Sequence, residues 1–254
     1  TVLIRSQQGE VLATAGNDFP QYYPQSGWVE HDAKEIWQSV LDALKEAIVL
    51  AGVSSSDCAG IGITNQRETT VLWDRGTGQP VHPAIVWQDR RTAELCQTLK
   101  DKGLEPLFRE RTGLLLDPYF SGTKIVWLLE NIAGLKECAQ QGEVLFGTMD
   151  SFLVHCLSGG KNHVTDATNA SRTLLYNLHQ GKWDEDLAAH LGVPLTMLPQ
   201  VCGNSEIVAY TQGVPGLKDG IPIAGMAGDQ QAALFGQTCF DVGDAKCTYG
   251  TGAF

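Results

Sequence analysis

The sequence has 254 residues, of which 43% are hydrophobic, enough to bury the core of one large domain or two small ones. Its formal charge of -11 argues against nucleic-acid binding, which depends on clustered lysines and arginines. The seven cysteines include no Cys-x-x-Cys pair, which argues against a zinc site, and no apolar run reaches the roughly 20 residues of a membrane helix. We therefore expect a cytoplasmic protein without nucleic-acid or membrane partners.

Two short strand-like runs open the chain. Residues 2–4 and 11–14 are separated by polar residues and a glycine, which predicts an antiparallel hairpin. Asp32, followed three residues later by Glu35, resembles a capping box, and the apolar spacing after it predicts an amphipathic helix that ends near Gly52.

Strands and helices alternate beyond this helix. The pattern predicts a buried strand at 60–64 and further strands at 69–73, 84–87, 144–146 and 221–224. It predicts helices at 92–100, 123–131, 151–157, 184–191 and 230–235. An opening hairpin, followed by strands that alternate with helices, indicates an α/β fold with a mixed, partly antiparallel sheet flanked by helices.

A cation and a carboxylate follow the predicted strand at 60–64. Arg67 and Glu68 lie just past its end, where ligands usually bind in α/β sheets. Because arginine only donates and an ionised glutamate only accepts, the pair could bind neighbouring hydroxyls of a polyol. The local sequence alone favours a solvated surface salt bridge.

An acid follows the predicted strand at 221–224. Asp229 comes directly after a glycine-containing segment, residues 225–228, that would let the backbone approach a ligand. Asp229 is a candidate general base, although the local sequence favours an ordinary helix N-cap.

Two further features are candidates for ligand contact. Lys246 is expected to lie in a strand that ends in a turn at Gly250, Thr251 and Gly252, where backbone N–H groups would cradle a phosphate; a plain hairpin turn is the local alternative. Three aromatic residues could line a small pocket, although aromatics are usually core: Trp87, Tyr119 and Phe254.

Taken together, four segments resemble the FGGY family of carbohydrate kinases. The most diagnostic is residues 119–131, which match the family signature at Lys124, Trp127 and Asn131. The other segments, residues 62–70, 84–92 and 227–237, resemble the glycerol kinase branch of the family more than its pentulose kinases.

This resemblance implies a ribonuclease-H-like fold, shared with actin, hexokinase and Hsp70, and ATP-dependent phosphorylation of glycerol to sn-glycerol 3-phosphate with Mg²⁺. It implies that Asp229 accepts the proton of the attacking hydroxyl and that Gln230 lies beside it. The remaining implied contacts are hydrogen bonds between the glycerol hydroxyls and Arg67, Glu68, Tyr119 and Asp229, packing on its carbons by Trp87 and Phe254, and contacts to the nucleotide phosphates by Gly250, Thr251 and Gly252.

The resemblance also sets expectations about organisation. Residues 1–254 are expected to form the substrate-binding N-terminal domain, without the first phosphate loop of the family and without its C-terminal adenosine-binding domain. Such a fragment should be inactive alone, and the intact protein is expected to be a homo-oligomer. Residues 213–218 lack the glycine-rich basic pattern with which bacterial relatives bind fructose 1,6-bisphosphate. No metal ligand is indicated.

Three alternatives remain open from the sequence. A kinase for another polyol or a pentulose would keep Asp229 and the turn at 250–252 but would need a roomier pocket. A non-catalytic polyol-binding module would use the same pocket without phosphate transfer. An assembly domain would leave the pocket residues unexplained.

Overall fold

An antiparallel hairpin opens the chain in the computed structural model, which describes residues 1–250 and 253–254. Strand β1 (Val2–Arg5) pairs with β2 (Val11–Ala15), as the sequence predicts. Helix α1 (Ala33–Ala51) begins where the Asp32 carboxylate accepts the Lys34 N–H at 2.7 Å, and Gly52 ends it with a φ of 65°. Asp32 is the N-cap, but the predicted capping box is wrong, because Asp32 accepts from Lys34 and not from Glu35, and the Glu35 carboxylate accepts the Tyr22 hydroxyl.

Two parallel strands carry the candidate site. Strand β4 (Ile61–Asn65) pairs with β13 (Pro222–Gly228), and β12 (Ala209–Tyr210) pairs antiparallel with the other edge of β13. The prediction of a buried strand at 60–64 is only half right, since isoleucines that are partly buried alternate with exposed residues in β4. Strand β13 is longer than predicted and includes the glycines at 225 and 228.

The other strands form small pairs around this sheet. Antiparallel pairs join β3 (Glu30–His31) to β6 (Ala84–Ile85), β5 (Val71–Asp74) to β7 (Val144–Gly147), and β9 (Tyr176–Asn177) to β10 (Lys182–Trp183). A parallel pair joins β8 (Val164–Asp166) to β11 (Gln200–Cys202). The mixed α/β fold is therefore confirmed, with the described strands divided among several small sheets.

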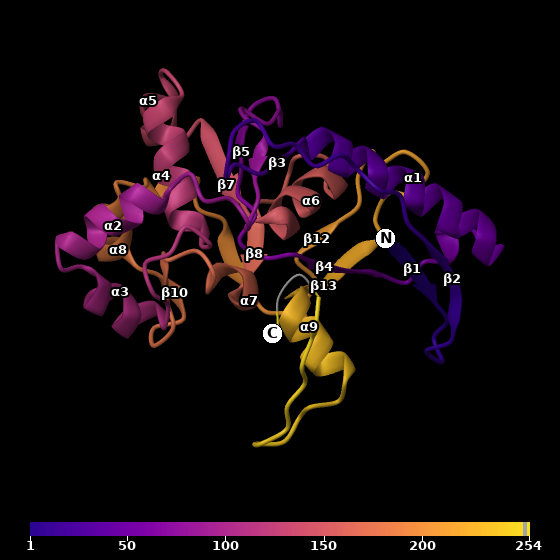
Figure 1. Ribbon diagram of the computed structural model, residues 1–254. Coiled ribbons are helices and arrows are strands. Elements are labelled where there is room, and N and C mark those ends of the chain that lie inside the picture. The colour runs from indigo at the N-terminus through magenta and orange to yellow at the C-terminus, as the bar shows by residue number, and fades with distance from the viewer. Residues whose placement is uncertain (251–252) are drawn as a thin grey trace.

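Helices surround the strands (Figure 1). They are α2 (Ala93–Asp101), α3 (Glu105–Thr112), α4 (Ser121–Asn131), α5 (Leu135–Gln140), α6 (Met149–Leu157), α7 (Ala167–Ala170), α8 (Glu185–Leu191) and α9 (Asp229–Gly236), with single 3₁₀ turns η1 (Ser55–Asp57) and η2 (Leu195–Met197). Helices α2 to α5 and α8 gather on one side of the molecule, and the β1–β2 hairpin with α1 lies on the opposite side. Within the described ranges, no helix is both long and apolar enough to cross a membrane.

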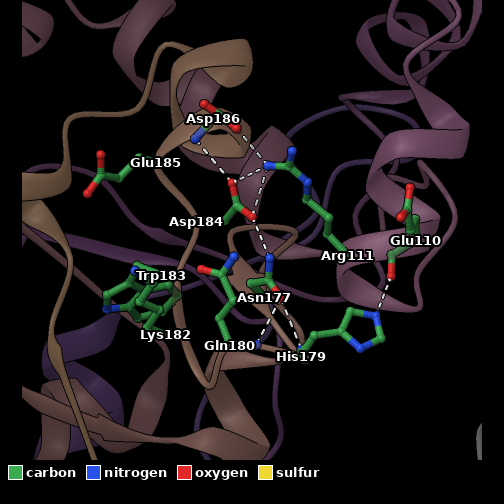
Figure 2. A pocket seen from close by; sticks show the side chains of 10 residues that line it. All are labelled: Glu110, Arg111, Asn177, His179, Gln180, Lys182, Trp183, Asp184, Glu185 and Asp186. Atoms are coloured by element: carbon green, nitrogen blue, oxygen red, sulfur yellow. Dashed lines mark hydrogen bonds and ion pairs between the residues drawn. The ribbon is translucent and has the colours of Figure 1, made fainter.

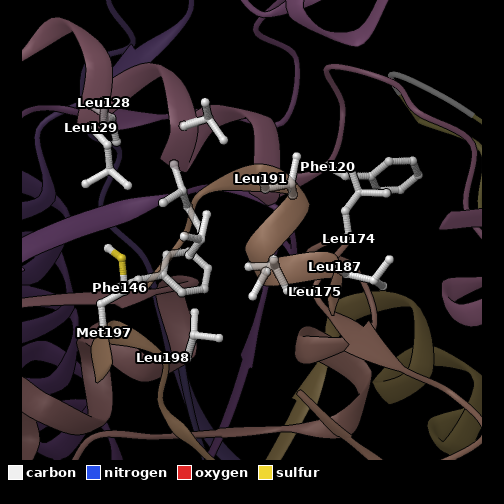
Figure 3. Packing of buried hydrophobic residues seen from close by; sticks show 14 of the residues in the cluster. Phe120, Leu128, Leu129, Phe146, Leu174, Leu175, Leu187, Leu191, Met197 and Leu198 are labelled. Carbon is white, nitrogen blue, oxygen red and sulfur yellow. The ribbon is translucent and has the colours of Figure 1, made fainter. Parts of the chain in front are cut away.

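The main hydrophobic core lies between α4, α8 and β7 (Figure 3). Phe146 of β7 and Leu187 of α8 are almost completely buried there, together with Leu128 of α4. Burial of each such side chain stabilises the fold by about 1.5 to 3 kcal/mol. This core fixes the position of α4, and Tyr119 lies in the segment directly before that helix.

Candidate active site

Arg67 and Glu68 follow β4, and both are buried. Their exposed fractions are 7% and 2%, so the solvated surface salt bridge that the local sequence favours is wrong. Glu68 has a φ of 48°, in the left-handed region that a non-glycine residue rarely adopts. Its carbonyl accepts hydrogen bonds from the hydroxyls of Thr70 at 3.2 Å and Ser121 at 2.9 Å, which stabilise this conformation.

Asp229 lies opposite this pair, at the start of α9. The Arg67 Nε atom is 3.5 Å from Oδ1 of Asp229 and 3.8 Å from Oε1 of Glu68, so one guanidinium lies between two carboxylates. The N-cap interpretation of Asp229 is wrong, because Gly228 occupies the N-cap position. The Asp229 side chain is 43% exposed and therefore accessible to a substrate, and its Oδ1 accepts the Gln230 N–H at 2.8 Å.

Gly228 is the reason that Arg67 can approach Asp229. A Cβ atom at this position would lie 2.5 Å from Cδ and 2.7 Å from Cγ of Arg67, distances that real Cβ contacts do not show. The Gly228 N–H also donates to the Thr168 hydroxyl at 2.7 Å, which holds the end of β13. Only glycine therefore lets the stem of Arg67 cross this strand.

Aromatic side chains gather next to the charged groups. The rings of Trp87 and Tyr119 lie 5.5 Å apart, and those of Trp87 and Phe254 lie 6.5 Å apart, both edge to face. Trp87 and Tyr119 are half-buried and Phe254 is 42% exposed, so none of the three is fully buried, although Tyr119 packs against the main core. The Trp87 Nε1 donates to Gln66 at 3.2 Å. We call Trp87, Tyr119 and Phe254 the aromatic wall.

Lys124 fixes the segment that carries Tyr119. Its ammonium donates to the carbonyls of Pro118 at 2.7 Å, Tyr119 at 2.6 Å and Phe120 at 3.2 Å, and the side chain is fully buried. Burial lowers the pKa of Lys124 to about 7, although nearby carboxylates oppose the shift. Burial, followed by the charge of Glu68, raises the pKa of Tyr119. The sequence marks Lys124 only as part of a signature and does not reveal this structural role.

Arg172 is a site residue that the sequence analysis missed. Its Nε donates to Oε1 of Glu68 at 2.7 Å, although the two residues are 104 positions apart in the chain. Burial raises the pKa of Glu68, and the hydrogen bond and charge of Arg172 partly offset this shift. No local pattern distinguishes Arg172 from an ordinary surface arginine, so only the fold reveals the contact.

The expected phosphate turn is described only in part. Gly250 is exposed, while Thr251 and Gly252 lie outside the described residues. The strand predicted before the turn is wrong, since Lys246 is not in a strand. Two backbone hydrogen bonds between Thr248 and Phe254, at 2.7 and 2.9 Å, join the flanks of the turn as in a hairpin. Lys246 donates to the side chains of Gln230 and Thr248.

A polar hollow of about 460 Å³ lies elsewhere, between α3 and α8, and contains none of the predicted site residues (Figure 2). Arg111 donates there to Asp184 and Asp186 at 2.9 Å, and Asp184 also accepts from Asn177 at 2.8 Å. These polar groups are already paired with one another by hydrogen bonds, so we interpret them as a structural network that lines the hollow.

No cluster of three or more His, Cys, Asp or Glu residues in the described ranges could hold a metal ion. The seven cysteines are all free. The candidate site is therefore a combination of charged and aromatic side chains, brought together from six separate segments of the chain.

Residues 1–236 match the model of the N-terminal domain of the FGGY family of carbohydrate kinases. The chain belongs to this FGGY family. It is 59% identical to a glycerol kinase of Alkalilimnicola ehrlichii over 99% of this chain and 51% of the relative, and 57% identical to one of Agrobacterium fabrum over 96% and 49%. The chain thus spans about half the length of these curated FGGY relatives.

Solved structures agree with the assignment to FGGY. The Plasmodium falciparum glycerol kinase with ADP is 37% identical, with a TM-score of 0.87 over 93% of this chain and 47% of that one. The xylulose kinase of Rhodospirillum rubrum has a TM-score of 0.88 over 99% of this chain and 51% of that one. At 22% identity, the xylulose kinase supports the fold alone. The ribonuclease-H-like fold expected from the sequence is confirmed.

Proposed function

We propose that this chain is the substrate-binding part of a longer kinase that phosphorylates glycerol to sn-glycerol 3-phosphate with ATP. The observation that carries the proposal is the placement of Arg67 between Glu68 and Asp229, beside the aromatic wall. High identity to glycerol kinases over nearly the whole chain supports glycerol as the substrate.

The geometry suits a small polyol. Arg67 donates and Glu68 accepts, so adjacent hydroxyls find complementary partners, while the Tyr119 hydroxyl adds a further polar group. Trp87 and Phe254 supply an apolar surface for the carbon chain. A substrate held on both its polar and its apolar sides keeps one hydroxyl oriented for transfer.

Asp229 is proposed to orient the attacking hydroxyl and to accept its proton. Its exposure lets a substrate approach, and the Arg67 guanidinium at 3.5 Å holds the carboxylate in place. In a loose phosphoryl-transfer transition state the nucleophile needs little deprotonation, so orientation is the main contribution of this carboxylate.

ATP is proposed to enter with Mg²⁺ as one substrate. Among the described residues, no group of three or more His, Cys, Asp or Glu side chains could hold the ion. Magnesium commonly keeps several waters and binds through substrate phosphates, which needs few protein ligands. Gly250, Thr251 and Gly252 are proposed to contact the phosphates, and the Lys246 ammonium near Gln230 adds a positive charge on that side.

The chain covers about half the length of the glycerol kinases that it matches. This supports an enzyme of two parts, in which residues 1–254 bind the polyol and a further domain binds adenosine. The 254-residue chain alone is therefore proposed to be inactive. A cytoplasmic location, consistent with free cysteines, and assembly of the intact protein into a homo-oligomer belong to the same proposal.

Transfer of radiolabelled phosphate from ATP, measured with the full-length protein and its Asp229→Asn variant, tests the function. Glycerol should be phosphorylated in preference to larger polyols and pentuloses. Asp229→Asn keeps the size of the side chain but removes its charge, so turnover should fall roughly 10²- to 10⁴-fold while the glycerol KM changes much less.

Two of the alternatives predict different results. Faster turnover of a pentulose would support a kinase for a larger substrate. Glycerol binding without phosphate transfer would support a binding module. Near-normal turnover of Asp229→Asn would refute the role of Asp229.

A further inference from the structure

Arg172 connects Glu68 to the aromatic side of the site. It follows α7, and its side chain is 23% exposed. Its Nε donates to Oε1 of Glu68 at 2.7 Å, and its guanidinium carbon lies 4.9 Å from the ring centroid of Phe120 and 5.8 Å from that of Tyr119. One cation therefore contacts a buried carboxylate and two adjacent aromatic rings.

The backbone around Arg172 is fixed. The Arg172 N–H donates to the Asn169 carbonyl at 3.0 Å, and the Arg172 carbonyl accepts the Ser121 N–H at 3.4 Å. Asn169 is itself buried, and its amide exchanges hydrogen bonds with that of Asn65 at the end of β4. Arg172 is thus tied both to α4, through Ser121, and to the strand that precedes Glu68.

The two oxygens of Glu68 differ in their contacts. Oε1 accepts from Arg172 and lies 3.8 Å from Nε of Arg67. Within residues 1–250 and 253–254, no group donates a hydrogen bond to Oε2. Because an ionised carboxylate has lone pairs on both oxygens, Oε2 is able to accept a hydrogen bond from a ligand.

We propose that Arg172 is a positioning residue for the polyol: by binding Oε1 of Glu68 it fixes the carboxylate so that Oε2 accepts a substrate hydroxyl. This role rests on the proposed phosphorylation of glycerol. Arg172 itself acts through Glu68 and is not assigned a contact with the substrate.

The charge of Arg172 is part of this role. A protonated Glu68 would donate from one oxygen and would be a weaker acceptor there. The charged or titratable groups that face Glu68 are Arg67 on the same segment, Arg172 after α7, Lys124 of α4 and the Tyr119 phenol. Burial favours the protonated form of Glu68, and the hydrogen bond from Arg172 opposes it.

The test uses the full-length protein and its Arg172→Met, Arg172→Lys and Arg109→Met variants. Arg109→Met is the matched control, since Arg109 is exposed on α3. Glycerol KM and kcat are measured from pH 5 to 9, together with the thermal unfolding midpoint. Arg172→Met should raise the glycerol KM about 10- to 100-fold, with a smaller loss in kcat.

The pH dependence separates positioning from a merely structural role. In Arg172→Met, the rise in glycerol KM at low pH should begin at a higher pH than in the wild type, because Glu68 then protonates more easily. Arg172→Lys, which keeps the charge, should restore most of the wild-type pH profile. A KM and pH profile equal to those of the Arg109→Met control would overturn the proposal.

A double-mutant cycle with Glu68→Gln gives a second test. If Arg172 acts through Glu68, Arg172→Met should raise KM much less in the Glu68→Gln background than in the wild type, whereas independent effects would multiply and overturn the proposal. Should Arg172→Met fail to fold, Arg172→Gln, which also removes the charge, replaces it in the same cycle and is judged by the same criterion. A wild-type enzyme that does not phosphorylate glycerol refutes the proposed function, while an active one with independent effects refutes only the role of Arg172.

Discussion

Replacement of Gly228 by alanine should displace the Arg67 side chain without substituting any charged residue of the site. The added Cβ would lie 2.5 Å from Cδ of Arg67, about 1 Å closer than the optimal separation of two carbon atoms. The contact involves the stem of the side chain, which cannot turn away as a free end could. Arg67 must therefore move away from Asp229 and from the site of the proposed hydroxyl contact.

The size of the effect follows from the lost interaction. A hydrogen bond to a charged donor contributes about 1.5 to 3 kcal/mol, so the glycerol KM of Gly228→Ala should rise about 10- to 100-fold. Arg67→Ala, which removes the same donor entirely, should produce at least as large an increase. The fall in kcat should be smaller if Arg67 serves mainly in binding.

Steady-state kinetics of the full-length protein, with isothermal calorimetry for glycerol, measures the effect. Gly225→Ala is the matched control: it lies in the same strand, and its Cβ would meet only ordinary contacts at 3.7 and 3.9 Å. A Gly228→Ala enzyme whose glycerol KM stays within about twofold of that of the control would refute the role of Arg67 in polyol binding. Unfolding midpoints of both variants check that the comparison concerns intact protein.

Two further predictions concern stability. Burial raises the pKa of Asp150 from 3.8 to about 6, so between about pH 4 and pH 6 the folded state retains a proton that the unfolded state releases. The free energy of unfolding should therefore fall as the pH rises through this window, by about 3 kcal/mol more in the wild type than in Asp150→Asn. Urea unfolding measures this difference, and parallel pH profiles of the two proteins would contradict it. Gly122→Ala would place a Cβ 2.6 Å from the backbone oxygen of Thr173, so the free energy of unfolding should fall by about 1 to 3 kcal/mol. In the control Gly236→Ala the added Cβ meets nothing within 4 Å, so the free energy of unfolding should stay close to that of the wild type, and equal values for the two variants would contradict this packing.

The sequence predicts well those elements whose signals are local. The α1 helix has its apolar spacing, its cap at Asp32 and its terminal Gly52 within one segment, and the structure reproduces all three. The opening hairpin likewise depends on neighbouring residues. The sequence does not predict short elements without periodicity, among them α5, α7 and the two-residue strands β3, β9, β10 and β12, because their conformations depend on tertiary packing.

The candidate site illustrates the same limit. Local sequence treats Arg67 and Glu68 as a surface pair, since burial cannot be read from two adjacent residues, whereas the resemblance to FGGY kinases assigns both residues to the polyol. Neither the local pattern nor the resemblance indicates Arg172, whose partner lies 104 residues earlier in the chain. Contacts of this kind arise from the arrangement of the elements and leave no local pattern.

The buried ammonium of Lys124 has a consequence for the redesign of substrate range. Because it holds three consecutive carbonyls around Tyr119, the backbone of that segment cannot be moved independently of α4. A roomier pocket is therefore more readily obtained by exchanging the side chain of Tyr119 or Trp87 on an unchanged backbone than by remodelling the segment. Libraries that vary Lys124 would lose most members to misfolding, whereas libraries that retain it can sample many shapes of the aromatic wall.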